Sequence, residues 1–237
     1  MKKIVLASIL ALSISCTTYA QKTIKGNNTV GTELRKTESY DKITLIGSPD
    51  VELVTGLEGN ITIKAETNLI PYIETYVKGD HLFIHFKEGY SYQTRKGVKI
   101  IVPIQDLSKI SLKGSGDITG NHIFTDKNLD VGIEGSGDIS INVENENLNV
   151  DVFGSGDLKI KGKTNRFNAN VKGSGDIKAK DLKSNSSKLK VNGSGDIEST
   201  TTSNVSADVF GSGDIKIYGN PPKVEKSVNG SGEVKLK

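Results

Sequence analysis

A four-residue motif, Gly-Ser-Gly-Asp, recurs through the second half of the chain and constrains its fold more than any other feature. Six copies and a final Gly-Ser-Gly-Glu variant begin at Gly114, Gly135, Gly154, Gly173, Gly193, Gly211 and Gly230. Successive copies lie 18 to 21 residues apart. A regular repeat of this length is typical of proteins in which each copy forms one structural unit that stacks on the next.

The residues around each motif alternate between apolar and polar. The second residue before the first glycine is Leu, Ile or Val in every copy, and so is the residue after the Asp or Glu. Alternation is the pattern of a β-strand with one buried face. A single unit cannot bury that face alone, whereas stacked units align Val on Val and Ile on Ile. We therefore predict an all-β chain that forms a β-solenoid, or β-helix, since a propeller blade needs about 40 residues.

The glycines of the motif are predicted to form a structural corner in each coil. The alternation places both of them on the inward side and the Ser and Asp on the outward side. Glycine at such a place indicates a bend too tight for a Cβ atom, or a close approach of two backbones. The corner glycines are Gly114, Gly116, Gly135, Gly137, Gly154, Gly156, Gly173, Gly175, Gly193, Gly195, Gly211 and Gly213.

The motif carboxylates are expected to form a row on one outer edge. The row consists of Asp117, Asp138, Asp157, Asp176, Asp196 and Asp214, followed by Glu233. Neighbours would lie about 4.8 Å apart, so their repulsion must be tolerated or neutralised. Either each carboxylate accepts hydrogen bonds from backbone N–H groups at its corner, or calcium bridges successive coils. The repeat differs in length from the known nine-residue calcium repeat, which favours the first interpretation.

The first 20 residues have the features of a signal peptide. Two lysines precede an apolar run from Ile4 to Ile14, and small residues lead to a cleavage site after Ala20. The run is too short to span a bilayer, which requires about 20 residues. Lipid attachment at Cys16 is the alternative, but Ser13 makes a poor lipobox and cleavage is favoured. We predict export to the periplasm, the outer membrane surface or the medium.

The charge of the chain is close to balanced. It carries 31 basic and 28 acidic residues, and two of the lysines belong to the predicted signal peptide. A nucleic-acid partner would require a basic stripe or a recognised motif, and neither is present. The sequence also lacks a cofactor motif, so we expect no cofactor.

The residues from Tyr40 onward resemble the bacterial head GIN domain family, whose members are described as putative auto-transporter adhesins of Bacteroidetes. The resemblance covers roughly Tyr40 to Lys237. It rests on Tyr40-Asp41-Lys42-Ile43, on Gly47-Ser48-Pro49-Asp50-Val51, on Asn68-Leu69-Ile70-Pro71-Tyr72 and on the repeated motif. It implies a right-handed β-helix, an exported location and an adhesion-like role, and it brings no catalytic residues. Because the chain ends at Lys237 directly after its last repeat, we do not expect it to translocate itself.

The domain organisation follows from these segments. Residues 1–20 are predicted to be the signal peptide, 21–39 a linker, 40–112 an irregular β cap and 113–237 the regular solenoid, with 40–237 one continuous domain. Strand patterns in the cap cover Ile61–Ala65, Tyr72–Val77, Leu82–Phe86 and Val98–Val102, with a hairpin loop at Lys78-Gly79-Asp80. A cap is expected because an open end exposes unpaired strand groups.

Seven aromatic side chains lie between residues 40 and 92. Tyr90 and Tyr92 fall in a polar segment from Gly89 to Gly97, where a loop is expected, and they are the candidate ligand surface because aromatic rings stack on sugars. The alternative is that these rings fill the core of the cap. His81 and His85 lie on one strand about 13 Å apart, so they cannot share a metal ion.

Three functional classes remain open. The leading one is a non-catalytic, adhesin-like binding module of the cell envelope or surface, whose partner is a glycan or an envelope protein. Recognition would then use the polar inter-coil segments, which are expected to be loops: Asn142–Asn147, Lys161–Arg166, Leu182–Lys188 and Ser199–Asn204. The second class is a structural protein that associates with itself. The third is a polysaccharide-active β-helix enzyme, which the repetition of the acidic residues disfavours because a catalytic site is singular.

Overall fold

The structure is a computed structural model that describes residues 22–237. The predicted signal peptide, including Cys16 and the cleavage site after Ala20, lies outside the described residues. Within residues 22–237, no helix is long and apolar enough to cross a membrane.

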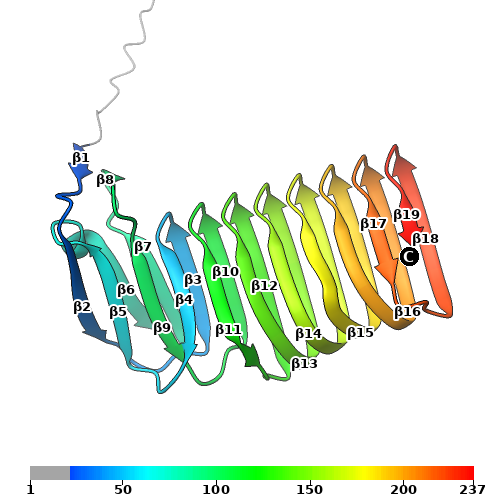
Figure 1. Ribbon diagram of the computed structural model, residues 1–237, viewed down its shortest axis with the longest axis horizontal. Coiled ribbons are helices and arrows are strands. Elements are labelled where there is room, and N and C mark those ends of the chain that lie inside the picture. The colour runs from blue at the N-terminus through cyan, green and yellow to red at the C-terminus, as the bar shows by residue number, and fades with distance from the viewer. Residues whose placement is uncertain (1–21) are drawn as a thin grey trace, which may run out of the picture.

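The repeated half of the chain is a β-solenoid in which each coil is one long bent strand (Figure 1). These strands are β13 (Ile139–Gly154), β14 (Leu158–Gly173), β15 (Ile177–Gly193) and β16 (Ile197–Gly211). Each begins after one corner, curves through an arch at the opposite edge and ends at the next corner. Neighbouring coils pair in parallel, so Ile139 faces Leu158 and Gly154 faces Gly173. The prediction of an all-β solenoid with coils of about 19 residues is confirmed.

The remaining strands complete the large sheet at both ends of the solenoid, except for β1 and β8, which form a separate two-stranded sheet. They are β1 (Lys22–Lys25), β2 (Val30–Lys36), β3 (Lys42–Gly47), β4 (Asp50–Thr55), β5 (Asn60–Glu66), β6 (Ile73–Lys78), β7 (His81–Phe86), β8 (Tyr90–Gln93), β9 (Lys99–Ile104), β10 (Lys109–Gly114), β11 (Ile118–Phe124), β12 (Asn128–Gly135), β17 (Ile215–Tyr218), β18 (Lys223–Gly230) and β19 (Val234–Leu236). A short 3-10 helix, η1, covers Ile70–Tyr72. The strand patterns predicted for the cap correspond to β5, β6, β7 and β9.

The core is a set of apolar ladders between the two layers of each coil. Val150, Val152, Ile139 and Ile141 of β13 are all buried. Their partners in β14 occupy the same positions because the pairing is in register. Burial of apolar surface contributes roughly 25 cal/mol per Å², and here that surface becomes buried only when coils stack. The apolar residues of the alternating sequence pattern are thus the residues that form the core.

The corner glycines are required by the neighbouring coil. Gly154 has φ of +124°, and a Cβ atom built on it would lie 2.3 Å from the carbonyl oxygen of Gly135. A Cβ atom on Gly156 would lie 2.1 Å from the carbonyl oxygen of Gly137. The predicted close approach of backbones is therefore present. Of the two glycines expected to face inward, Gly156 is buried and its Cβ atom would also lie 3.1 Å from the core side chain of Ile133, whereas Gly154 is half-buried and its Cβ atom would meet only the backbone of the preceding corner.

The N-terminal end differs from the prediction in its first strands. Residues 21–39 were expected to be a linker, but they contain β1 and β2. Strand β2 pairs antiparallel with β5, with Val30 opposite Glu66 and Lys36 opposite Asn60. The expected hairpin at Lys78-Gly79-Asp80 is present between β6 and β7. The cap therefore contains antiparallel strand pairs, unlike the repeats, in which neighbouring coils pair in parallel.

The polar inter-coil segments are not loops. Residues 142–147, 161–166, 182–188 and 199–204 lie inside β13, β14, β15 and β16, where each strand bends through the arch. In β15 and β16 the arch also buries hydroxyl groups. Thr201 Oγ1 lies 3.0 Å from Ser184 Oγ, 2.7 Å from Ser187 Oγ and 3.2 Å from Ser199 Oγ. Mutual hydrogen bonding makes the burial of these polar groups acceptable, and this explains why a polar segment lies in the core.

Candidate functional site

The corner carboxylates form a hydrogen-bonded ladder along one edge of the solenoid. The backbone N–H of Asp157 donates to Asp138 Oδ1 at 2.8 Å, and that of Asp176 donates to Asp157 Oδ1 at 3.0 Å. The same bond joins every neighbouring pair from Asp50 to Glu233. The predicted use of the carboxylates as backbone acceptors thus has a geometric basis, but each one serves the next corner rather than its own.

Lysines of the adjoining strands neutralise part of this row. Lys178 Nζ donates to Asp157 Oδ2, and the carboxylate raises the pKa of Lys178. Lys235 Nζ donates to Asp214 Oδ2 at 2.9 Å, and this hydrogen bond lowers the pKa of Asp214. Both oxygens of Asp157 and Asp214 therefore have partners. Within the described residues no group of three or more His, Cys, Asp or Glu side chains could hold a metal ion.

Tyr90 and Tyr92 lie on β8, which pairs in parallel with β1, so the expected loop is a strand. Their rings belong to a half-buried aromatic cluster with Tyr72 and Phe86. Tyr92 stacks on Phe86 with ring centroids 4.3 Å apart, and Tyr90 meets the edge of Tyr72 at 5.3 Å. Tyr92 also donates its hydroxyl to Lys87 O at 2.7 Å. The two tyrosines are thus partly committed to holding the cap together.

The two histidines on β7 point outward but serve different neighbours. His81 Nε2 lies 2.7 Å from Thr44 Oγ1, and burial together with Lys109 and Lys42 lowers its pKa. His85 Nε2 lies 3.7 Å from Glu74 Oε2.

A depression lies on the sheet face formed by the strand segments that lead into the corners, which we call the groove face. It is a groove of about 530 Å³ across β10, β12, β13, β14 and β15. Parallel pairing places Ser111, Gly132, Asp151 and Asn170 in one row along its middle. Gly132 leaves the groove open, because a Cβ atom there would meet nothing within 4 Å.

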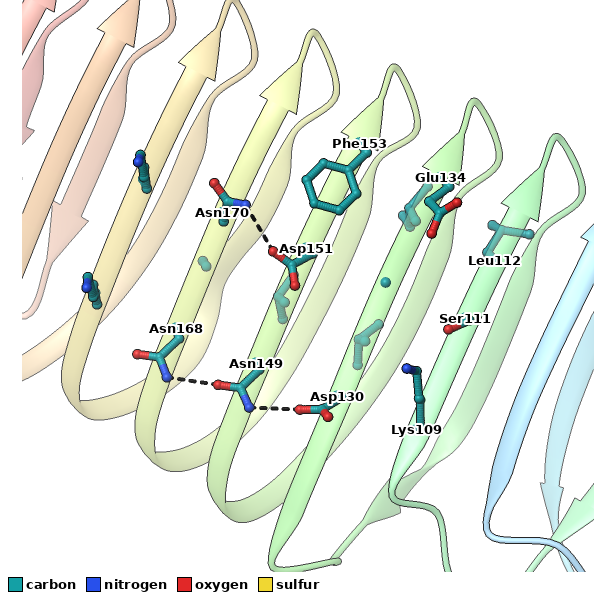
Figure 2. Close-up of a pocket in the computed structure, with 17 residues that line it drawn as sticks. Lys109, Ser111, Leu112, Asp130, Glu134, Asn149, Asp151, Phe153, Asn168 and Asn170 are labelled. Atoms are coloured by element: carbon teal, nitrogen blue, oxygen red, sulfur yellow. Dashed lines mark hydrogen bonds between the residues drawn. The ribbon is translucent and has the colours of Figure 1, made fainter. Parts of the chain in front are cut away.

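Polar side chains form a hydrogen-bonded network along this groove (Figure 2). Asn149 Nδ2 donates to Asp130 Oδ1 at 2.8 Å, and Asn168 Nδ2 donates to Asn149 Oδ1 at 2.8 Å. In the middle row, Asn170 Nδ2 donates to Asp151 Oδ1 at 3.0 Å. These bonds hold the carboxamides in one orientation, and each amide nitrogen still carries a second donor.

Aromatic rings lie at the groove and beside it on the same face. Phe153 lines the groove next to Asp151 (Figure 2) and has Lys172 Nζ 5.1 Å from its ring centre. Toward the cap, Phe83 occupies the same row as Ser111, two strands away. Phe83 stacks between His81 and Tyr76, with ring centroids at 4.3 Å and 5.2 Å.

The groove was not found from the sequence. Asn149, Asp151, Asn168 and Asn170 occupy outward positions of alternating strands, where polar residues are expected and carry no distinct signal. Gly132 was the available clue, since it is a glycine in a strand pattern outside the corner motif. Such a glycine marks a close approach or a missing side chain, and only the structure shows which of the two applies.

Comparison with known proteins shows similar solved structures from Bacteroides and Parabacteroides. A putative adhesin from Bacteroides fragilis has 28% sequence identity and a TM-score of 0.86, covering 90% of this chain and 100% of its own. A putative lipid binding protein from Parabacteroides distasonis has 27% identity and a TM-score of 0.75, covering 91% of this chain and 100% of its own. A putative adhesin from Parabacteroides distasonis, at 24% identity and a TM-score of 0.75, shares the fold.

No curated protein matches the chain. The family model described as "Putative auto-transporter adhesin, head GIN domain" matches residues 39–221. That range runs from the entry to the cap to the end of β17 and includes all four long coils. The chain therefore belongs to the head GIN domain family of putative auto-transporter adhesins.

Proposed function

We propose that this protein is an exported, non-catalytic binding module of the bacterial cell envelope or surface, and that it recognises its partner through the groove face. The observation that carries the proposal is that the edge of the solenoid and its groove face have different roles. At the edge, the corner carboxylates and glycines are occupied by contacts between coils. On the face, rigid carboxamides surround an open groove.

The side chains of the groove favour binding over catalysis. Glycoside hydrolysis requires a pair of carboxyl groups, one available as an acid and one as a base or nucleophile. The groove carboxylates are instead engaged by neighbours: Asp130 by Asn149, Asp151 by Asn170, and Glu134 by Lys113 Nζ at 3.0 Å. Each of these carboxylates already has a hydrogen-bonding or charged partner on the neighbouring strand, which supports a scaffold that binds without turnover.

The proposal is tested by binding of the purified protein to envelope fractions and intact cells of the source bacterium. We expect saturable binding that decreases when the groove is filled by substitution and persists when Tyr90 and Tyr92 are both changed to Ser. Loss of binding only in the tyrosine variant would move the site to the aromatic cluster of the cap. Turnover of any member of a polysaccharide panel would contradict the non-catalytic assignment.

Self-association is a second candidate function, favoured by the last coil. In Figure 1, β18 and β19 form the outermost coil at the C-terminal end. Val228 is 43% exposed and Leu236 is 57% exposed, although both occupy core positions of the repeat. An exposed apolar strand can pair with another molecule. Sedimentation as a strict monomer at high protein concentration would exclude this function.

A further inference from the structure

We infer that the groove binds a neutral, linear glycan that lies along the solenoid axis and crosses successive strands over Ser111 and Gly132. The inference rests on the proposed function and specifies the ligand class and the residues that contact it. Four independent properties of the groove support it: its shape, its charge, its hydrogen-bonding groups and its spacing.

The shape is that of a trough whose bottom is formed by small residues. Ser111 and Gly132 are the small residues of the middle row, whereas Asp151 and Asn170 continue that row with larger side chains. The trough therefore runs across neighbouring strands instead of along one of them. An extended chain molecule fits such a trough better than a compact ligand, which would be enclosed on more sides.

The charge of the groove favours a neutral ligand. Its ionisable lining residues are three lysines, Lys109, Lys188 and Lys190, and three acids, Asp130, Glu134 and Asp151. A polyanion would be attracted by an excess of lysine, and a cationic peptide would be attracted by an excess of carboxylate. Because lysines and acids are equal in number, the groove has no excess charge that would attract either kind of ligand.

The hydrogen-bonding groups suit hydroxyl groups. Asn149 and Asn168 each donate one N–H to the network and retain another, and each carboxamide oxygen has a further lone pair. A sugar hydroxyl both donates and accepts, so it can bind to donor and acceptor groups that alternate along a row. The mutual bonds of Asn149 and Asn168 fix these groups before a ligand arrives, which reduces the entropy lost on binding.

The spacing of the strands matches the repeat of a sugar chain. Strands of the groove face lie about 4.8 Å apart, which is close to the length of one pyranose unit in an extended β-linked chain. Each successive sugar would therefore lie over the next strand of the groove. Phe153 at the rim offers a ring for the apolar C–H face of a pyranose, and the Phe83 stack offers a second ring further along the same face.

Two matched pairs of variants test the inference. Gly132→Ile fills the trough at a position with open space above the strand, while Ser227→Ile makes a comparable change in the same row on β18. Phe153→Ala removes the ring at the groove, while Tyr218→Ala removes a ring outside the groove that also lies under a lysine, Lys180 Nζ at 4.8 Å. Circular dichroism and thermal melting check that all four variants fold.

The probes are neutral linear oligosaccharides of two to six units with β-1,4, β-1,3 or α-1,4 linkages, measured by titration calorimetry. We expect at least one series to bind with affinity that increases with length. Binding should be lost in Gly132→Ile and about tenfold weaker in Phe153→Ala, with no change in either control.

Three results would overturn the inference. The first is that no oligosaccharide series binds. The second is that the groove variants and their controls bind the oligosaccharides equally well. The third is that a fluorescent fatty acid binds in the groove and no sugar displaces it. Envelope binding that decreases in Gly132→Ile together with any of these results would leave the proposed function standing and would refute only the ligand class. Loss of all envelope binding in the unmodified protein would refute the proposed function itself.

Discussion

Two kinds of glycine lie on the same strands, and adding a side chain has opposite consequences at each. Gly154 has a positive φ and faces the carbonyl oxygen of Gly135. Gly132 lies three residues before a corner, points away from the core and has free space beside it. Gly154 allows the coils to stack closely, whereas Gly132 leaves the groove open.

Gly154→Ala is expected to destabilise the protein, because the new Cβ atom would lie 2.3 Å from Gly135 O and the backbone conformation suits only glycine. Backbone strain alone costs about 1–3 kcal/mol. Gly132→Ala is the matched control and should stabilise the strand by about 0.5–1 kcal/mol. Urea denaturation followed by circular dichroism measures both. Similar unfolding midpoints for the two variants would contradict the proposed role of the corner.

Glu66 fastens the N-terminal cap. Its Oε1 accepts from Asn28 N at 2.7 Å, and its Oε2 accepts from Thr94 Oγ1 at 2.8 Å and Arg95 N at 2.9 Å. The hydrogen bond from the backbone of Arg95 is the largest cause that lowers the pKa of Glu66. One carboxylate thus joins the start of β2, the end of β5 and the segment before β9.

The lowered pKa of Glu66 predicts acid sensitivity of the cap. A group with a lowered folded pKa contributes stability that is present above its unfolded value, about 4.3, and is lost as the pH falls through the folded value. We expect hydrogen exchange in β1 and β2 to accelerate below about pH 4.3. Glu66→Gln should make this exchange faster at neutral pH and less dependent on pH. Glu38→Gln, an exposed control near β2, should behave like the unmodified protein.

At the scale of elements, the acidic ladder joins each corner to the next. Asp157 accepts the backbone N–H of Asp176 through Oδ1 and contacts Lys178 through Oδ2. The ion pair is largely exposed, so it contributes at most about 1 kcal/mol. The hydrogen bond to the backbone contributes more than the charge because its loss leaves a half-buried N–H group without an acceptor.

Asp157→Asn is therefore expected to cost less than about 1 kcal/mol, since the carboxamide oxygen can still accept from Asp176 N. Asp157→Ala removes the acceptor and should cost about 1–3 kcal/mol. Chemical denaturation of both variants makes the comparison. If the asparagine variant were as unstable as the alanine variant, charge would dominate the ladder.

The calcium hypothesis for the same row makes a separate prediction. Because the oxygens of Asp157 and Asp214 already have backbone or lysine partners, we expect EDTA to leave the melting temperature unchanged. An increase in melting temperature with added calcium, reversed by EDTA, would support a bridging ion between coils.

The repeat predicted the strand ends at the corners correctly, but it did not predict that the strands continue through the arch. The corners and the strands beside them followed from the glycines and the alternation. The arch was predicted to be a loop because Ser184, Ser187 and Thr201 are polar. Their hydroxyl groups are buried because they bond to one another across two coils, and a partner that distant in sequence cannot be recognised from polarity alone.

At the scale of the whole molecule, the side chains of the last coil control whether two copies associate end to end. Lys226 pairs with Ala207, a fully buried core position, yet its own side chain is exposed. An inward-directed charge on an outer strand opposes the addition of another strand, because stacking would bury the charge without a partner.

Lys226→Val is accordingly expected to promote association, detected as faster-sedimenting species that increase with protein concentration. Lys223→Val is the control, since it removes the same charge from the same strand at an outward position paired with Asn204. Equal sedimentation of both variants and the unmodified protein would show that Lys226 does not protect this end.

The sequence by itself determined the solenoid, its coil length, the glycine corners and the row of acids, because a repeat reports the same local environment many times over. The tertiary structure decided what those residues contact. It placed the acids on the N–H groups of the next coil, turned the expected linker into β1 and β2, and put the expected loop tyrosines on a paired strand. It also brought Gly132 beside Ser111 and Asp151, 21 and 19 residues away in the chain. A groove formed across strands depends on register, and register exists only once the coils are stacked.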